Sequence, residues 1–362
     1  MGTVLRNMTL RNGQVADIVI SDGKIAEIAA PGIGQGEVVA EGGYVSSGWI
    51  DMHVHAFQEL KPYGDAIDEI GLKQGVTTIV DAGSCGANRI GELLAAGEGA
   101  KTRLLAFLNI SRIGLERIDE LSDLSWIDEK AAREALRAHP DFIVGLKARI
   151  SRSVVKEQGI EPLRRARQLS EATGLSLMVH IGSGPPAIGE VMALLERDDI
   201  VTHYLNGKAN NLFDEQGRPL PALVDAVARG VRLDVGHGTA SFAFRVAEQA
   251  KAHGIPLQTI STDIYESNRL DGPVYSLADV MTKFLYLGYS LEEVVDAVTV
   301  NAATWLGRPE LAEVKVGGAA DLTVFEVVQG SKTLTDSEGE TRTAETYIQA
   351  KGAVIDGSYF AC

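Results

Sequence analysis

The middle of the chain repeats one pattern: a short apolar run typical of a buried β-strand, followed by a stretch with helical periodicity. Eight such runs occur, namely WIDMHVHAF, VTTIVDAGS, LLAFLNIS, FIVGLKARIS, LSLMVHIG, IVTHYLNG, VRLDVGHG and PLQTISTDIY. The stretches between them, such as IEPLRRARQLSEATG and PALVDAVARG, carry apolar residues at helical spacing. Strands that alternate with helices form parallel βαβ units, and eight units in about 250 residues predict a closed (β/α)8 TIM barrel.

Both ends of the chain are instead rich in short strands and turns. ADIVISDGKIAEIAA contains two Val- and Ile-rich runs joined at SDGK, and Asp-Gly tolerates the positive φ angles of a hairpin turn. Near the other end, LADVMTKFLYLGYS and LEEVVDAVTVNAATWLG predict two helices, VKVGGAADLTVFEVV predicts strands, and a polar segment, SKTLTDSEGETRTAE, separates these from a last strand in YIQAKGAVIDG. We expect an α/β chain with a barrel over residues 49–309 and a small β-sandwich domain built from both termini, 1–48 plus 310–362.

Composition narrows the function classes. The 362 residues are 45 % hydrophobic and 23 % charged, which is an ordinary globular composition with enough length for a large core. A net charge of −15 would repel a phosphate backbone, so we expect no nucleic-acid partner. The start MGTVLRNMTL lacks a signal-peptide core, Cys85 and Cys362 cannot build a disulfide framework, and no run reaches the roughly 18 apolar residues of a membrane span. These features predict a cytoplasmic protein that acts on a small-molecule substrate, with no membrane partner; a homo-oligomer stays open.

Histidines gather where a barrel places its catalytic groups, at the carboxyl ends of the strands. Five of the seven do so, and polar residues of the fourth and eighth runs join them: His53, His55, Lys147, His180, His203, His237 and Asp263. Because residues i and i+2 of a strand point to the same side, His53 and His55 both face the barrel axis with Cβ atoms about 6 to 7 Å apart. One such histidine is usually a satisfied core residue. Four of them on three strands at one rim predict a metal centre.

This pattern resembles the amidohydrolase superfamily of metal-dependent hydrolases. The family carries H-x-H on the first strand, Lys on the fourth, His on the fifth and sixth, and Asp on the eighth, and its members also have a small β domain built from both ends. The resemblance therefore covers nearly the whole chain. It implies two divalent metal ions, usually zinc, bridged by a lysine that CO₂ has carboxylated. On that resemblance, the ligands are His53, His55 and Asp263 for one metal, His180 and His203 for the other, and carboxylated Lys147 between them.

Physical chemistry supports two of these roles. Burial and neighbouring positive charge would depress the pKa of Lys147 and leave a neutral amine that can react with CO₂, whereas the alternative is a lysine that snorkels to solvent. Two metal ions about 3.5 to 4 Å apart would lower the pKa of a shared water to about 7 and so activate hydroxide. Asp263 could then carry a proton to the leaving group as the catalytic acid and base. The alternative for Asp263 is a helix N-cap.

The residues that contact the substrate are harder to assign. Dihydroorotases, which share these ligands, commonly carry H-x-H-x-R with an Arg for the substrate carboxylate, but this chain has Phe57 there. Arg149, two residues beyond Lys147, and Arg112 are the alternative anion clamps, or else surface ion pairs. His237 could bind substrate or hydrogen-bond Asp263, or simply pack under its loop. Cys85 is a candidate thiolate near the metals, although a small buried hydrophobe is the better interpretation.

Within the superfamily, three motifs look most like a deacetylase subgroup: DAGS after the second strand, K-A-R on the fourth and V-x-H-x-G-x-G-P-P after the fifth. That likeness implies hydrolysis of an amide or ester bond in a small N-acetyl or O-acetyl carboxylic acid, such as an acetyl-amino acid or an acetyl-hydroxy acid. A dihydroorotase-like cyclic amide hydrolase is the alternative. A non-catalytic scaffold or a small-molecule binding module is disfavoured, because the chain keeps every ligand of the set.

Overall fold

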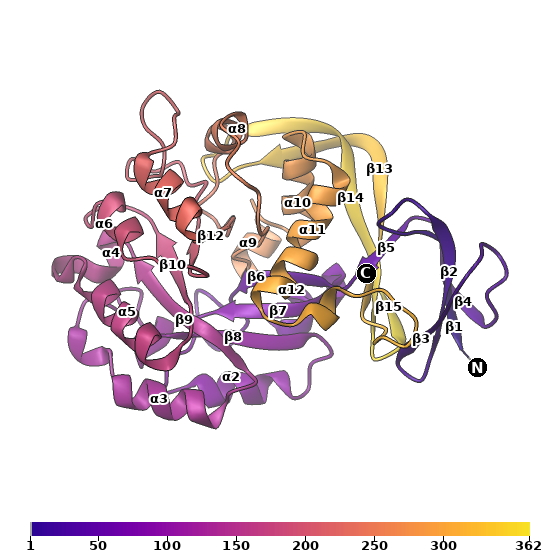
Figure 1. Cartoon of the computed structure of the whole chain (residues 1–362), viewed down its shortest axis with the longest axis horizontal. Coiled ribbons are helices and arrows are strands. Elements are labelled where there is room, and N and C mark those ends of the chain that lie inside the picture. Colours follow the sequence, from indigo (N-terminus) through magenta and orange to yellow (C-terminus); the bar gives the residue numbers. More distant parts are fainter. Residues whose placement is uncertain (1) are drawn as a thin grey trace.

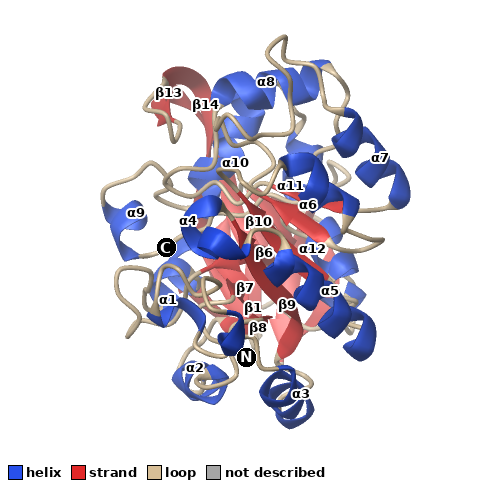
Figure 2. Ribbon diagram, turned by 90° about the vertical axis from the view of Figure 1, so that its left-hand side faces the viewer, coloured by secondary structure: helices blue, strands red, loops and turns tan. Residues whose placement is uncertain are grey.

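Seven parallel strands form the sheet at the centre of the chain, with helices around it (Figures 1 and 2). The structure is a computed structural model that describes residues 2–362. Each strand pairs with the one before it in the sequence, in the order β12-β11-β10-β9-β8-β7-β6. Their bounds are β6 Trp49–Val54, β7 Val76–Ala82, β8 Arg103–Asn109, β9 Ile143–Ile150, β10 Leu177–Ile181, β11 Ile200–Thr202 and β12 Arg232–Asp234. Each of the first seven predicted runs coincides with one of these strands, although β8 begins one residue before its run.

The eighth predicted run is not a regular strand. Its residues form only isolated parallel bridges, from Thr259 to Asp234 at the end of β12 and from Ile264 to Val54 at the end of β6. Two further backbone hydrogen bonds tie it to the end of β6. The N–H of His55 donates to the carbonyl of Ile264 at 3.0 Å, and the N–H of Asp263 donates to the carbonyl of His53 at 2.7 Å. The segment therefore touches both edges of the curled sheet and lies between them.

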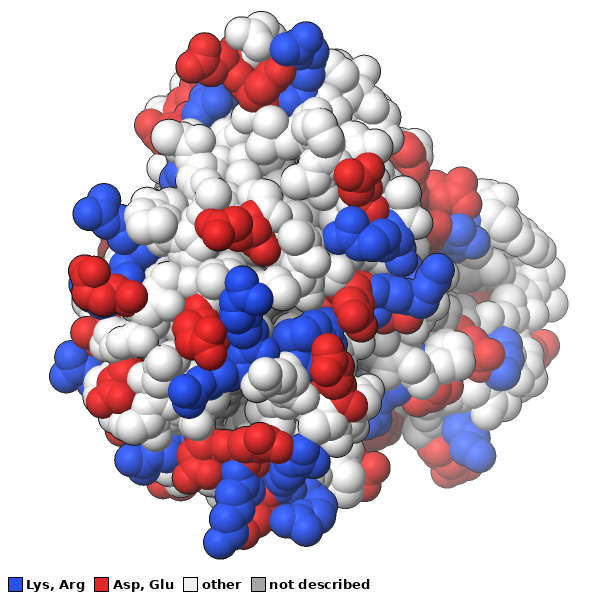
Figure 3. All heavy atoms as spheres, turned by 60° about the vertical axis from the view of Figure 1, so that its left-hand side comes forward, with Lys and Arg blue, Asp and Glu red and all other residues white. Residues whose placement is uncertain are grey.

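Helices follow most of the strands. Their bounds are α1 Ile67–Ile70, α2 Ile90–Gly97, α3 Glu129–Ala138, α4 Arg152–Val155, α5 Glu161–Thr173, α6 Ile188–Ala193, α7 Pro221–Arg229, α8 Phe244–Ala252, α9 Glu266–Leu270, α10 Leu277–Tyr286, α11 Leu291–Ala297 and α12 Val300–Trp305. Within residues 2–362, none of them is long and apolar enough to cross a membrane. On the face drawn in Figure 3, acidic and basic side chains are interspersed.

Helix α5 shows why the sequence pattern succeeds. It begins with Pro162 in its first turn, where no backbone N–H is needed, and ends at Gly174, whose φ of 71° suits a residue without a Cβ. Leu163, Ala166 and Leu169 recur at helical spacing and are buried. Burying each such leucine stabilises the fold by about 1.5–3 kcal/mol. The helix therefore forms almost over the predicted range.

The prediction of a single helix over residues 291–307 is wrong, because the structure has two helices there, α11 and α12. Thr299 leaves the helical region, with φ −131° and ψ −90°, and its hydroxyl donates to the carbonyl of Val295 at 2.6 Å. The carbonyl of Val298 instead accepts the N–H of Ile50 in β6 at 2.8 Å. The interruption thus gives β6, the first strand of the parallel sheet, a backbone partner.

A second sheet joins the two ends of the chain, drawn in indigo and yellow in Figure 1. Strand β5 from the N-terminal part pairs antiparallel with β13 from the C-terminal part, and the full order is β15-β14-β13-β5-β1-β2-β3, with β4 on β1. The bounds are β1 Thr3–Thr9, β2 Val15–Ser21, β3 Lys24–Ala29, β4 Glu37–Glu41, β5 Tyr44–Ser47, β13 Leu322–Thr335, β14 Thr341–Ile355 and β15 Ser358–Ala361. The predicted hairpin turn is confirmed, with positive φ at Asp22 and Gly23. All eight strands share one hydrogen-bonded sheet, so the predicted sandwich is not confirmed.

The prediction that the polar segment of residues 331–345 separates two strands is also wrong. The segment forms the outer half of the long β13–β14 hairpin, whose pairing continues from Lys332 with Ala344 to Thr335 with Thr341. Cross-strand backbone bonds hold it together, and Leu334 and Ala344 are its only apolar side chains, both packed in the core. The far end of this hairpin reaches α8, where the carboxylate of Asp336 accepts the N–H of Phe244 at 2.9 Å.

Candidate metal centre

The six side chains that the sequence singled out as metal ligands converge in the structure. His53 lies on β6 and His55 directly follows that strand, Lys147 lies on β9, and His180 lies on β10. His203 follows β11, and Asp263 lies in the segment that bridges the two edges of the sheet. Five of the six line one cavity of about 140 Å³, and His203 lies beside it; the lining residues are His53, His55, Tyr63, Leu115, Lys147, Arg149, His180, Lys208, Thr239, Ala240, Ser241, Asp263 and Tyr265.

Asp263 lies at the middle of this cluster. Its Oδ1 atom is 3.3 Å from Nε2 of His53 and 3.2 Å from Nε2 of His55. His53, His203 and Asp263 each present a ligand atom within 4.8 Å of the other two. The His180 and His203 rings are edge to face, with centroids 4.4 Å apart. Nitrogen and oxygen donors of this kind, gathered at one point, suit a divalent transition metal.

His203 carries the clearest sign that the cluster fits a metal. Its Nδ1 atom lies 2.5 Å from the carbonyl oxygen of Gly236, so Nδ1 carries the proton and donates. Its Nε2 atom is buried and has no hydrogen-bond partner among residues 2–362. Burial holds the pKa of His203 well below its usual value, which keeps the lone pair on Nε2. A neutral imidazole oriented by a carbonyl, with its other nitrogen unpartnered, is what a metal ligand requires.

The other imidazoles are oriented in a similar way. Nδ1 of His53 lies 3.0 Å from the hydroxyl of Thr202, which donates to the carboxylate of Asp234 at 2.7 Å. Nδ1 of His55 lies 2.8 Å from the hydroxyl of Ser84. These contacts leave Nε2 of both rings facing Asp263. Partners of this kind fix the ring tautomer and the direction of the metal-binding lone pair.

Asp263 does not act as a helix N-cap, which was the alternative role that the sequence left open. Its carboxylate faces the imidazoles, and its carbonyl accepts a hydrogen bond from the side chain of Asn268 at 2.9 Å. Burial acts to raise the pKa of Asp263, but the charge and hydrogen bonds of His53 and His55 outweigh it and hold the pKa well below its usual value. Asp263 has a φ of 54° and His203 one of 69°. Left-handed backbone at non-glycine residues costs energy and clusters at functional sites.

Lys147 does not snorkel to solvent, because it is only 1 % exposed. Its Nζ atom lies 3.3 Å from Nε2 of His53 and 3.4 Å from the sulfur of Met178. Burial lowers the pKa of Lys147 to about 8, although the negative charges of Asp263 and Asp234 act in the opposite direction. A neutral amine is therefore accessible near physiological pH, as carboxylation requires.

The candidate substrate contacts behave differently from one another. Arg149 lines the cavity, but its Nε and Nη2 atoms pair with the buried carboxylate of Glu120, both at 2.7 Å. Arg112 is not among the lining residues. His237 also lies outside the cavity lining, with its Nε2 atom 2.8 Å from Nζ of Lys283 and its Nδ1 atom 2.9 Å from the carbonyl of Gly238. The structure therefore favours the packed alternative for His237.

Cys85 is a buried residue of the core cluster, and burial raises the pKa of its thiol. It is not among the residues that line the cavity. A raised pKa keeps the thiol protonated, so the position gives no support to a thiolate ligand.

Five polar or aromatic side chains that line the cavity were not identified from the sequence. Tyr63 and Tyr265 are edge to face with ring centroids 5.3 Å apart, and the hydroxyl of Tyr265 lies 2.7 Å from that of Thr239. Lys208 and Ser241 complete the set. All of them lie on loops beyond predicted strand ends, and that address was the only signal that could have identified them.

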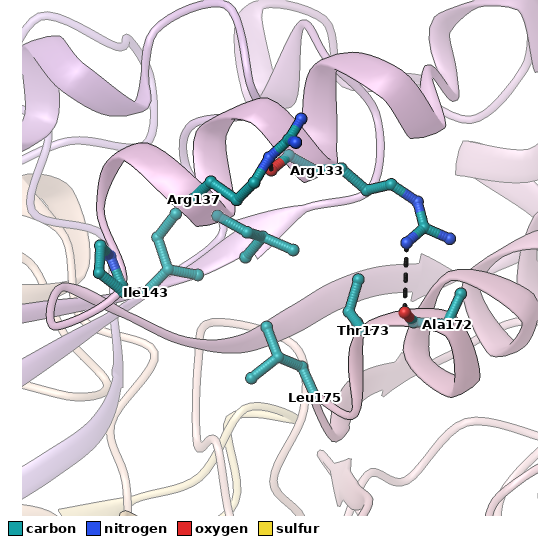
Figure 4. A pocket seen from close by; sticks show the side chains of 8 residues that line it. Arg133, Arg137, Ile143, Ala172, Thr173 and Leu175 are labelled. Carbon is teal, nitrogen blue, oxygen red and sulfur yellow. Dashed lines mark hydrogen bonds between the residues drawn. The ribbon is translucent and has the colours of Figure 1, made fainter.

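A second cavity, of about 590 Å³, lies between α3 and the end of α5 (Figure 4). Arg133 donates to the carbonyl of Ala172 at 3.2 Å and to the carboxylate of Glu129 at 2.9 Å, and Arg137 bonds the carbonyl of Arg133. Its lining contains no histidine, acid, cysteine or lysine. This cavity therefore lacks the groups that hydrolysis or metal binding requires.

Comparison with known proteins agrees with this geometry. A family model described as a deacetylase-like composite domain matches residues 314–361. A protein named deacetylase from Enterococcus faecalis is 42 % identical over 362 residues, which is 99 % of this chain and 98 % of the relative. A solved structure titled as an adenine deaminase has a TM-score of 0.95 at 41 % identity and 99 % coverage of both chains. Another, titled as a dihydroorotase, has a TM-score of 0.90 at 33 % identity, covering 99 % of this chain and 98 % of the other. The chain therefore belongs to the deacetylase family of the amidohydrolase superfamily, and it is a hydrolase acting on C–N bonds.

Proposed function

We propose that this protein is a binuclear metal-dependent deacetylase that cleaves the amide or ester bond of a small N-acetyl or O-acetyl carboxylic acid. The observation that carries the proposal is the convergence of His53, His55, Lys147, His203 and Asp263 around one small cavity. The relative named deacetylase supports the acetyl group as the part removed. A cavity of about 140 Å³ suits a small substrate.

The residues present fit two metal ions. His53, His55 and Asp263 would hold one, His180 and His203 the other, and carboxylated Lys147 would join them, with zinc as the expected metal. When bound, the ions would supply Lewis-acid polarisation of the substrate carbonyl and activation of water at neutral pH. Carboxylation of the neutral Lys147 amine by CO₂, with release of a proton, would place an anion among the imidazoles, where it could bind cations.

Asp263 would handle the proton. Its low pKa keeps the carboxylate ionised, so its free oxygen can accept a proton from water as the water attacks the carbonyl. The same atom would then return the proton to the leaving nitrogen or oxygen. The bridging segment holds Asp263 through the hydrogen bond from its N–H to the carbonyl of His53, so the proton acceptor keeps a fixed position relative to the ligands.

A cyclic amide hydrolase of the dihydroorotase type is the second candidate, because the solved structure with that title is similar over nearly the whole chain. One feature disfavours it. Phe57 stands where an arginine would grip the substrate carboxylate, and it is buried beneath the guanidinium of Arg89, whose Cζ lies 4.7 Å from the ring centroid. That position therefore cannot supply an anion contact in this chain.

We further propose that the segment 259–264 completes a closed (β/α)8 barrel over residues 49–309, with 1–48 and 310–362 as the second domain. The two isolated bridges at its ends support this closure. A cytoplasmic location and a small-molecule substrate stay predictions, and a homo-oligomeric state stays open.

Hydrolysis of a substrate panel tests the proposal. Zinc-loaded protein is offered N-acetyl-D- and N-acetyl-L-amino acids, acetyl-hydroxy acids, dihydroorotate and hydantoins. We expect acetate release from one of the acetyl acids and loss of that activity in Asp263→Asn. The control, Asp271→Asn, removes an exposed carboxylate at the end of α9 and should keep the activity. Turnover of the cyclic amides alone, or full activity in Asp263→Asn, would contradict the proposal.

A further inference from the structure

The charges around the cavity are not balanced. Three cationic residues line it, Lys147, Arg149 and Lys208, together with one acid, Asp263. Lys147 lies among the candidate metal ligands, and Arg149 is neutralised by Glu120, which is fully buried. Arg149 also donates from Nη2 to the carbonyl of Ile118 at 2.9 Å, so two of its three nitrogens are occupied. This leaves Lys208 as the cation without a partner.

Lys208 forms no ion pair and no side-chain hydrogen bond with any residue from 2 to 362, although it is half-buried. Burial lowers the pKa of its ammonium group, and the charge of Asp263 only partly offsets this. Desolvating a cation without pairing it costs free energy. Surface lysines avoid that cost by extending into water, so an unpaired lysine facing a cavity indicates that an anion binds there.

The loop that carries Lys208 is held firmly. The side chain of Asn206, which is fully buried, donates to the carbonyl of His203 at 2.9 Å and accepts the backbone N–H of Lys208 at 3.1 Å. The carbonyl of Gly207, between Asn206 and Lys208, accepts a hydrogen bond from Nη2 of Arg245 at 2.6 Å. The backbone of Lys208 is therefore held relative to His203, five positions earlier, so its side chain extends from a defined position at the cavity.

We propose that Lys208 binds the carboxylate of the substrate and sets the preference of this site for acids over their neutral amides. This inference rests on the proposed function for the identity of the substrate. The scissile carbonyl then lies at the end of the cavity formed by His53, His55 and Asp263, and the carboxylate lies at the loop after β11. Arg149 keeps the pocket wall in place through Glu120, rather than serving as the anion clamp that the sequence suggested.

Kinetics with matched substrates test the assignment. N-acetyl-amino acids are compared with the corresponding N-acetyl-amino acid amides, which lack the negative charge. In Lys208→Met, we expect kcat/KM for the acid to fall by about 10- to 100-fold, mainly through KM, and for the amide to change by less than about 3-fold. Lys208→Arg should keep part of the preference. Lys156→Met, which removes an exposed lysine outside the cavity lining, should leave both substrates unaffected.

A binding measurement separates this inference from the proposed function. Calorimetry with lactate and lactamide, a charged and a neutral probe of product size, needs no turnover. Tighter binding of lactate to the wild type, lost in Lys208→Met and kept in Lys156→Met, supports the inference even if no acetyl substrate is hydrolysed. Equal binding of the two probes, or equal effects of Lys208→Met on both, would overturn it even if deacetylation is found. The metal content of Lys208→Met, measured alongside, shows that the variant folds.

Discussion

The Nζ atom of Lys147 lies 3.3 Å from Nε2 of His53, although 94 positions separate the two residues in the sequence. Both side chains are about 1 % exposed, so both are shielded from bulk solvent. A lysine amine and an imidazole are both bases, and protonation of both would place two positive charges side by side in a buried site unless an anion joins them. The pair is therefore the contact that most directly suggests a carboxylated lysine among metal ligands.

Replacing Lys147 should abolish the metal centre. In Lys147→Met, we expect activity and metal content to fall together by about 100-fold or more, since even partners that only orient a ligand are worth about 10- to 100-fold. Lys147→Arg should be no better, because a guanidinium cannot be carboxylated. Elemental analysis and acetate release measure both quantities. A variant that keeps two metal ions would show that Lys147 is not a ligand.

Thr202 should matter without touching the metal or the substrate. Its hydroxyl links Nδ1 of His53 to the carboxylate of Asp234, so Thr202→Val removes the group that orients the ring. We expect metal affinity to fall by about 10- to 100-fold, seen as faster loss of activity in a chelator titration. Thr304→Val removes a comparable hydroxyl from the exposed side of α12 and serves as the control. Equal behaviour of the two variants would contradict the role of Thr202.

The seven-stranded parallel sheet and its helices could be predicted because these elements are local. Helix α5 has its start signal, its end signal and its buried stripe within one stretch, so the sequence alone defines it. The segment with Asp263 could not be predicted in detail, because its backbone bonds go to residues about 200 positions away and its φ is positive. The outer part of the β13–β14 hairpin could not be predicted either. Its polar strands pair across the hairpin and contact α8, and no apolar pattern records such pairing.

The candidate site divides in the same way. The convergence of the six candidate ligands could be predicted because parallel strands bring their carboxyl ends to one rim, so position along a strand determines position in space. The role of Arg149 could not be judged, since its partner Glu120 lies in a loop with no strand or helix signal. Lys208 was missed for the same reason, because it follows β11 on a loop whose shape depends on Asn206 and Arg245.

The outer end of the β13–β14 hairpin should stabilise the loop of residues 237–243, part of which lines the cavity. Helix α8 starts after Ala243, which has no capping side chain, and Asp336 supplies the missing acceptor for the N–H of Phe244. Asp336→Ala should lower the free energy of unfolding by about 1–2 kcal/mol. It should also speed amide hydrogen exchange in residues 237–243. The exposed Glu345→Ala on the same hairpin is the control, and unchanged exchange in Asp336→Ala would refute the coupling.

Lys283 should make stability depend on alkaline pH. Burial lowers its pKa to about 8, although Asp279 and Asp336 act to raise it, whereas an unfolded lysine titrates near about 10.4. Between these values the unfolded chain holds a proton that the folded chain has released, so this lysine makes stability rise with pH over that window.

Urea unfolding at pH 7.5 and pH 10 tests the prediction. The gain in unfolding free energy attributable to Lys283 should be absent from Lys283→Met and present in Lys130→Met, which removes an exposed lysine of α3. Identical pH dependence in the wild type and Lys283→Met would contradict the account.

Anomalous X-ray diffraction from crystals of protein purified without chelator tests the central claim most directly. The account predicts two metal peaks, one within about 2.0–2.2 Å of ligand atoms from His53, His55 and Asp263 and one at the same range from His180 and His203, with density for a carboxyl group on Nζ of Lys147 between them. Crystals of active enzyme with no metal peak among these side chains would contradict it.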